Sequence, residues 1–164
     1  MEELRTERLR LRAWTTSPGD LARMADLYGR EEIQRWVGGT PTVTPAVLVE
    51  RWATVHRLDE RYGCWAIEPP DGPVAGTVLF KPLPNGVGEV EVGWHLHPDS
   101  WGHGYATEAA RAVIARGFAA GVPVSIAKRA APVFSSLTSK ARLIVASGKT
   151  PISSPSLSAR SASS

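Results

Sequence analysis

The sequence predicts a mixed α/β domain in which a largely antiparallel sheet is combined with amphipathic helices. Three observations predict this class: an alternating apolar pattern near the N-terminus, two helical stripes after it, and three strand patterns joined by short turns that lead into a last helix. At 164 residues the chain is long enough to bury a core as one domain without disulfides or a structural metal.

The first half of the chain predicts one strand and two helices. The segment "TERLRLR" (6–12) alternates leucine with arginine, which is typical of a half-buried strand. The segment 17–29 places its apolar residues on one helical stripe. The segment 44–63 predicts a second helix, with Thr44 as its N-cap and Pro45 in the first turn.

The middle of the chain predicts an antiparallel meander followed by a helix. Strands are expected at 64–68, 73–81 and 89–97, separated by the turns "PPDG" and "PNG". A helix over 104–118 then follows a stretch that contains two glycines. The order of these elements favours a meander that feeds one strand–turn–helix unit.

Composition and charge exclude several classes of function. Cys64 is the single cysteine, so no internal disulfide can form. The sequence shows no charged leader and no long apolar run, so we expect a cytoplasmic protein with no membrane partner. All 16 acidic residues lie within 1–108, whereas 109–164 holds eight basic residues and no acid. These basic residues are sparse and not interleaved with aromatic residues, so we do not expect nucleic acid as a partner. No cluster of metal ligands is visible.

The stretch "HPDSWGHGYATEAARAVIARG" (97–117) carries the clearest functional signal. Glycine lowers helix stability by about 1 kcal/mol relative to alanine, yet Gly102 and Gly104 stand where a helix begins. A glycine-containing loop before a helix N-terminus favours an anion, because the first N–H groups of the helix have no internal partner. A Walker-type loop would need Lys-Ser/Thr after the last glycine. A dinucleotide fingerprint would need Gly or Ala at Thr107 and a later acidic residue, and both are missing.

A third phosphate-binding pattern fits this stretch. The segment "GWHLHPDSWGHGYATEAARAVIARGF" resembles the acyl-coenzyme A motif of the GNAT family of N-acetyltransferases, Gln/Arg-x-x-Gly-x-Gly/Ala, with Gly102 and Gly104 at its two small positions. Asp99 stands where Gln or Arg is usual. The segments "TERLRLR" and "EVGWHLHPDSWGHGYATEA" are similar to segments found in the ribosomal-protein-alanine N-acetyltransferase branch of this family. The resemblance covers residues 5–123 and implies the acyl-CoA N-acyltransferase fold.

The resemblance implies that acetyl-CoA is the co-substrate. We expect no metal, because the residues show no cluster of metal ligands. Backbone amides of the loop would hold its pyrophosphate, and the pantetheine arm would pair with the preceding strand around Leu96, with His95 and His97 as neighbours. We expect the side chains of Trp101 and Tyr105 to shape the loop by packing. The expected cofactor-binding residues are Leu96, His97, Trp101, Gly102, His103, Gly104, Tyr105, Ala106 and Thr107.

Acetyl transfer to an amine needs a base that takes the amine proton, directly or through water. Strand alternation places Glu89, Glu91, Gly93 and His95 on one face. Glu91 matches the glutamate of the family motif "EIG", a position often proposed as the base. The expected catalytic residues are Glu91 and, as the alternative base, His95. The competing interpretation is that Glu89 and Glu91 are solvated residues on a polar face.

The end of the chain departs from the family pattern. Family members continue after the central helix with a strand, a helix and two closing strands. Here "GVPVSIAK" (121–128) fits the first of these, and Ala141–Ser147 is the one later stretch with strand character. We therefore expect an N-acetyltransferase domain at 5–128 with a fold incomplete at its C-terminus, and a largely disordered Ser/Ala-rich basic tail at 129–164.

Two functions of different class follow. The first is an acetyl-CoA-dependent N-acetyltransferase that acts on a primary amine, either a protein N-terminus or a small amine. The second is a non-catalytic CoA-binding protein or a truncated or frameshifted remnant of such an enzyme. The expected partner is an amine acceptor, and a homodimer is an allowed assembly.

Overall fold

In the computed structural model, six strands form one sheet in the order β1-β2-β3-β4-β5-β6, with every neighbouring pair antiparallel. The structure describes residues 1–37, 42–83, 89–122 and 142–145. The strands are β1 (Leu4–Arg5), β2 (Arg10–Ala13), β3 (Gly63–Glu68), β4 (Gly76–Pro82), β5 (Val90–Leu96) and β6 (Arg142–Val145). The mixed α/β class expected from the sequence is confirmed.

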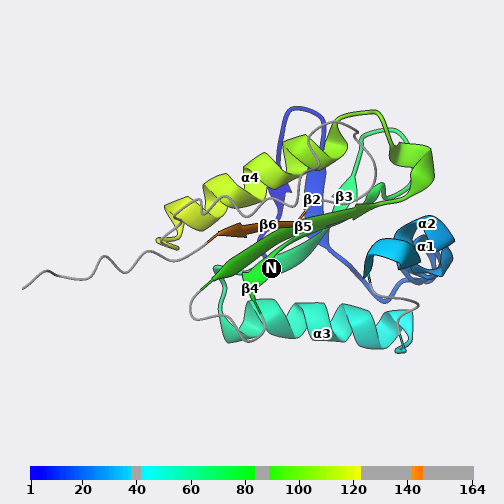
Figure 1. Cartoon of the computed structure of the whole chain (residues 1–164), viewed down its shortest axis with the longest axis horizontal. Coiled ribbons are helices and arrows are strands. Elements are labelled where there is room, and N and C mark those ends of the chain that lie inside the picture. The colour runs from blue at the N-terminus through cyan, green and yellow to red at the C-terminus, as the bar shows by residue number, and fades with distance from the viewer. Residues whose placement is uncertain (38–41, 84–88, 123–141, 146–164) are drawn as a thin grey trace, which may run out of the picture.

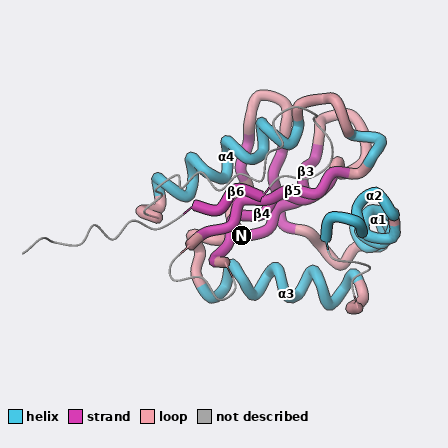
Figure 2. Tube along the Cα trace, in the orientation of Figure 1, coloured by secondary structure: helices cyan, strands magenta, loops and turns pink. Residues whose placement is uncertain are grey.

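Helices cover both faces of this sheet. Figure 1 shows α4 on one face and α3 on the other, with α1 and α2 beside one end of the sheet, and Figure 2 shows the strands running between these layers. The helices are α1 (Pro18–Gly29), α2 (Glu31–Val37), α3 (Pro45–Leu58) and α4 (Tyr105–Ala119), and a 3-10 turn, η1, spans Pro98–Ser100. In the described part of the chain, no helix combines the length and apolar character needed to cross a bilayer.

Each layer has its own apolar core. The α4 layer is built around Trp65, Phe80, Val92 and Val113, all of which are nearly fully buried. The opposite layer is formed by α1, α2 and α3 around Trp14, Met24, Leu27, Tyr28 and Ile33. Strand alternation separates these layers, because successive side chains of a strand point to opposite faces.

The N-terminal strand expected at 6–12 is a hairpin instead. The Thr6 N–H donates to the Leu9 carbonyl (2.9 Å), and the Leu9 N–H donates to the Thr6 hydroxyl (2.9 Å). This side-chain contact closes a turn, a behaviour common for threonine. Leu9 and Leu11 are nevertheless buried, as their alternation predicted.

Two helices also differ from the expectation. The helix α2 was not predicted, and it begins directly after Arg30 with Glu31 and Glu32 in its first turn, where acidic residues favour a helix. The helix expected over 44–63 ends at Leu58. Its start is as predicted, because the Thr44 hydroxyl accepts from the Val47 N–H.

The C-terminal part contributes one strand to the described structure. Strand β6 forms within the predicted stretch Ala141–Ser147 and pairs with Val90–Gly93 of β5. The expected strand at 121–128 falls, from residue 123 onward, outside the described residues. The same holds for the tail 129–164 apart from β6.

A close helix–sheet contact yields a test of this packing. The ring of Phe80 lies where the Cβ of a residue at Gly117 would be, so Gly117→Ala forces overpacking in the α4 core. Overpacking lowers the free energy of unfolding by about 1–3 kcal/mol, which exceeds the helix-propensity gain of about 1 kcal/mol. We expect a Tm lower by a few degrees in thermal unfolding. Gly19→Ala, in open space in α1, is the control and leaves the Tm unchanged or slightly higher. A Gly117→Ala Tm equal to that of the control would contradict this packing.

Candidate functional site: the loop between β5 and α4

The loop between β5 and α4 presents unpaired N–H groups at a helix start. Gly102 (φ 79°) and Gly104 (φ 78°) both adopt left-handed backbone conformations, which explains the two glycines. Gly104 is the N-cap of α4 and provides no side-chain cap. Within the described residues, the N–H groups of Tyr105, Ala106 and Thr107 have no hydrogen-bond acceptor. The helix dipole adds positive potential here, so this loop favours an anion.

Trp101 holds the loop against the end of β5. Its indole N–H donates to the Leu96 carbonyl (2.8 Å), and its ring packs against both apolar layers. The side chain of Trp101 is therefore a packing residue. His103 is exposed, and its ring stacks on that of Tyr105 with 5.2 Å between the centroids.

One carboxylate, that of Glu108, links the β1–β2 turn to the start of α4. Glu108 accepts from the Arg8 backbone N–H (2.9 Å) and from its Nε (2.8 Å), as well as from the Thr6 hydroxyl. The Arg8 guanidinium also donates to the His103 carbonyl (3.0 Å) and lies 5.5 Å from the Tyr105 ring centre. This contact places a cation beside the unpaired N–H groups. No local sequence signal predicted it, because the partners lie 100 residues apart.

An open groove of about 770 Å³ lies along this contact. Its lining comes from the β1–β2 turn and one side of α4: Thr6, Glu7, Arg8, Gly104, Thr107, Glu108, Arg111 and Ala112. Burial acts to raise the pKa of Glu108, but the hydrogen bonds from Thr6 and Arg8 outweigh it and hold this pKa below its usual value. The carboxylate is therefore charged at neutral pH and orients Arg8.

A second cluster ties the loop to α1. The His97 side chain is 5% exposed, and its ring lies between Asp26 (Nε2 to Oδ2, 2.9 Å) and Asp99 (Nδ1 to Oδ1, 2.9 Å). Arg23 pairs with Asp99 (2.8 Å) and donates to the Val74 carbonyl (2.7 Å). Burial acts to raise the pKa of Asp99, but the hydrogen bonds from Arg23 and Ser100 outweigh this effect and hold the pKa well below its usual range. The His97 side chain is thus directed into the protein and positions η1.

The edge of β5 nearest the loop is open in the described structure. The His97 N–H donates to Ala75 beyond the end of β4, so strand alternation directs the backbone groups of His95 and His97 toward β4. Those of Trp94 and Leu96 point to the other edge, where β6 pairs only as far as Gly93. Because Trp101 occupies the Leu96 carbonyl, the backbone groups that this edge offers are the Trp94 N–H, the Trp94 carbonyl and the Leu96 N–H.

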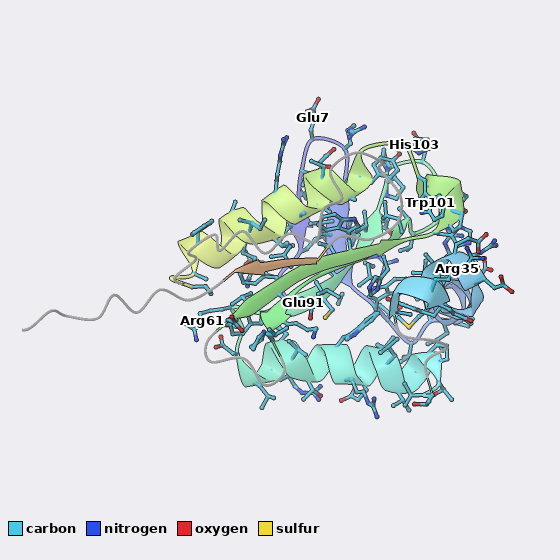
Figure 3. All side chains as sticks on the ribbon, viewed as in Figure 1. Glu7, Arg35, Arg61, Glu91, Trp101 and His103 are labelled. Carbon is cyan, nitrogen blue, oxygen red and sulfur yellow. The ribbon has the colours of Figure 1, made fainter. Side chains whose placement is uncertain are left out.

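The two candidate bases lie on the predicted common face but not together. Glu91 forms an ion pair with Lys81 (3.0 Å), and both side chains are mostly buried on the α3 side of the sheet, where Figure 3 shows Glu91. His95 contacts the hydroxyl of Tyr28 through Nδ1 (2.9 Å). Four residues of strand separate Glu91 from His95, a distance of about 13 Å. The sequence did not predict Lys81 or Tyr28 as partners, because strand and helix patterns do not determine which side chains meet across layers.

The described residues contain no group of three or more His, Cys, Asp or Glu side chains that could hold a metal ion. The site is therefore built from backbone N–H groups, one cation, and polar side chains on one face of β5.

Comparison with known proteins identifies relatives over most of the chain. A family model described as an acetyltransferase (GNAT) domain matches residues 8–138. The chain is 26% identical over 149 residues to the uncharacterized N-acetyltransferase YoaA of Bacillus subtilis, covering 88% of this chain and 81% of that protein.

Two solved structures share the fold. An acetyltransferase from Agrobacterium tumefaciens superimposes with a TM-score of 0.60 at 21% identity, covering 87% of this chain and 94% of that one. A protein described as a GNAT-family acetyltransferase from Bordetella pertussis gives a TM-score of 0.56 at 16% identity, covering 88% and 98%.

The Glu108 contact predicts a pH-dependent contribution to stability. Because the folded-state pKa of Glu108 is lowered, its stabilisation is present above the unfolded pKa and is lost as the pH falls through the folded pKa. Glu108→Gln should lower the free energy of unfolding by about 1–2 kcal/mol at pH 7, and by less at pH 3. The loss at pH 7 lies at the low end of the range for hydrogen bonds to charged groups, because the Arg8 side chain is half exposed. Denaturant unfolding at both pH values measures this.

Glu7→Gln is the matched control, because Glu7 is exposed in the same β1–β2 turn and forms no hydrogen bond or ion pair within the described residues. We expect it to change stability at neither pH. A Glu108→Gln difference of the same size at pH 7 and pH 3 would show that the charge of Glu108 does not hold the turn.

Proposed function

Because the chain belongs to the acetyltransferase (GNAT) domain family, we propose that it moves the acetyl group of acetyl-CoA to a primary amine, with the cofactor lying across the Gly102–Thr107 loop and the open edge of β5. The chain is an N-acetyltransferase, and enzymes of this family use acetyl-CoA as co-substrate. The observation that carries the cofactor site is the juxtaposition of three unpaired N–H groups at α4 with a strand end that lacks a partner within the described residues.

The loop fits the pyrophosphate of CoA. Two negatively charged phosphates need several hydrogen-bond donors, and the N–H groups of Tyr105, Ala106 and Thr107 provide them through the backbone. Glycine has no side chain, so no Cβ at Gly102 or Gly104 blocks the approach of the phosphates to these N–H groups. Arg8 places a positive charge beside the pyrophosphate position, and its ion pair with Glu108 neutralises part of that charge.

The pantetheine arm has two amides and fits the edge of β5 as an added strand. The Trp94 carbonyl and the Leu96 N–H are the groups that these amides would pair with, which leaves the Trp94 N–H for the carbonyl oxygen of the thioester. The arm would run from the loop toward Gly93, where β6 begins to cover the strand. In this proposal Leu96 binds through its backbone, whereas His97 and Trp101 position the loop.

The reacting thioester would then lie near Gly93 and Trp94. The amine nitrogen adds to the carbonyl carbon, the C–S bond breaks, and CoA leaves as a thiolate. The Trp94 N–H donates to the carbonyl oxygen as negative charge develops on it. Glu91 takes the amine proton through water, because it lies two to three strand residues from this point, about 7–10 Å. Lys81 keeps its carboxylate oriented.

For the acceptor we propose a protein N-terminus, in line with the resemblance to the ribosomal-protein-alanine branch. An α-amine has a pKa of about 7.7–8.0, against about 10.4 for a lysine side chain, so a larger fraction is unprotonated at neutral pH. Competition between an N-terminal peptide and its N-blocked, lysine-containing counterpart tests this. Faster acetylation of the lysine peptide would contradict it.

The cofactor site predicts a position-specific loss of binding. Gly104→Val places a branched side chain at the pyrophosphate position and forces a backbone conformation that valine avoids, so we expect at least about 100-fold weaker CoA binding by calorimetric titration. Gly121→Val is the matched control, with nearly the same backbone strain (φ 75°) but at the far end of α4. Equal affinities in the two folded variants would reject this loop as the cofactor site.

The assignment of the base predicts a change in turnover only. Glu91→Gln should lower kcat by about 10²-fold or more, within the range for acid–base catalysis, while CoA affinity stays the same. Glu89→Gln, two residues earlier, is the control and should retain kcat. A Glu91→Gln kcat within a factor of two of wild type would assign the proton to another acceptor.

A further inference from the structure

The buried Tyr28 hydroxyl determines which hydrogen-bonding state His95 can adopt. Tyr28 is 6% exposed, and among the described residues its hydroxyl has two polar neighbours: His95 Nδ1 at 2.9 Å and Thr77 Oγ1 at 3.5 Å. A buried hydroxyl needs an acceptor for its proton. Because O–H···O bonds normally measure 2.5–3.0 Å, about 3.5 Å is too long to compete, and the proton goes to His95.

A neutral imidazole accepts at one nitrogen and donates at the other. With Nδ1 accepting from Tyr28, the proton of the ring is on Nε2. We propose that Tyr28 holds His95 as a neutral Nε2–H donor. This inference rests on the proposed function: His95 hydrogen-bonds the developing oxyanion and does not take the amine proton. Tyr28 is then a positioning residue for the reaction.

The surroundings of the pair keep it in this arrangement. The rings of Tyr28 and His95 meet edge to face, with 5.6 Å between centroids and 85° between planes, and Trp52 packs on Tyr28 with 6.1 Å between the centroids. Burial raises the pKa of Tyr28, so its hydroxyl remains a donor at neutral pH. The residues that contact Tyr28 come from α3, β4 and β5, and they fix the tyrosine independently of any ligand.

The ionisable side chains that β3, β4 and β5 place near His95 on this face are Cys64, Lys81 and Glu91. Farther across the same face, Arg10 and Arg12 both pair with Glu68. Burial raises the pKa of the Cys64 thiol to about 12, so it is neutral near pH 7. Lys81 is paired with Glu91 (3.0 Å). Glu91 is the carboxylate of β5 on this face and the proposed proton acceptor, whereas Nδ1 of His95 is occupied by the Tyr28 hydroxyl and its Nε2 carries the proton.

The roles divide along β5 as follows. The amine nitrogen forms its bond to the carbonyl carbon, and the oxygen becomes an oxyanion that receives hydrogen bonds from the Trp94 N–H and His95 Nε2–H. His95 keeps its proton. The amine proton passes to Glu91 through water, the C–S bond breaks, and the proton then leaves Glu91 for the CoA thiolate or solvent.

The first test reads the tautomer of His95 in the protein without cofactor. Long-range ¹H–¹⁵N spectra distinguish the two ring nitrogens, and we expect the Nε2–H form in wild type near pH 7.5. Tyr28→Phe removes the donor, and a mixture of both tautomers should then result. Tyr62→Phe is the matched control, because Tyr62 stacks on Phe80 in the other layer, and Thr77→Val keeps the Tyr28–His95 bond; both should retain the Nε2–H form. A wild-type Nδ1–H ring, or spectra identical in Tyr28→Phe, would overturn the proposal.

The second test separates a donor from a base by turnover. A glutamine amide can place an N–H near the position of Nε2 but cannot accept a proton, so His95→Gln should keep kcat within about 10-fold of wild type. His95→Leu removes the donor and should lose about 10²–10³-fold, as for other oxyanion donors. Equal losses in both variants would overturn the donor role. If wild type acetylates no amine, the proposed function fails, whereas the ring spectra still decide whether Tyr28 controls His95.

Discussion

Strand β5 pairs with β4 along its whole length but with β6 only along its first half, and the rest of the site depends on this uneven pairing. The paired side fixes β5 against the rest of the sheet. Within the described residues, the other side leaves the backbone groups of Trp94 and Leu96 without a strand partner, directly before the turn into α4. A strand covered on both sides could position side chains, but it could not accept an extended cofactor as a further strand.

The loop that follows has the conformation it needs because distant segments hold it from two sides. Glu108 binds the β1–β2 turn through Arg8, and His97 and Asp99 bind α1 through Asp26 and Arg23. Glycine at 102 and 104 permits the left-handed backbone but does not by itself select it, since glycine also has the greatest freedom when unfolded. Side chains with lowered carboxyl pKa values fix a loop whose own residues contribute mainly backbone.

Periodicity predicted most of the fold because it reports burial, which is a local consequence of the sheet and helix layers. Leu9 and Leu11, the Thr44 cap and the meander strands were all predicted this way, and the family resemblance found in "HPDSWGHGYATEA" is confirmed by the family model. A side-chain hydrogen bond of Thr6 closes a turn within the predicted strand. The alternation of apolar and polar residues carries no information about such a bond. The partners of Glu91 and His95 were not predicted, because Lys81 and Tyr28 reach them across strands and layers. The functional roles of these residues remain proposals.

The central claim is that acetyl-CoA pairs with one specific set of backbone amides, and amide hydrogen exchange with and without acetyl-CoA tests it most directly. Bound acetyl-CoA should slow exchange at Trp94, Leu96, Tyr105, Ala106 and Thr107, whose N–H groups have no acceptor in the described structure. The account predicts no change at His95 and His97, whose N–H groups face β4. Protection that appears at His95 and His97 but not at Trp94 and Leu96, or no protection at the start of α4, would contradict the account.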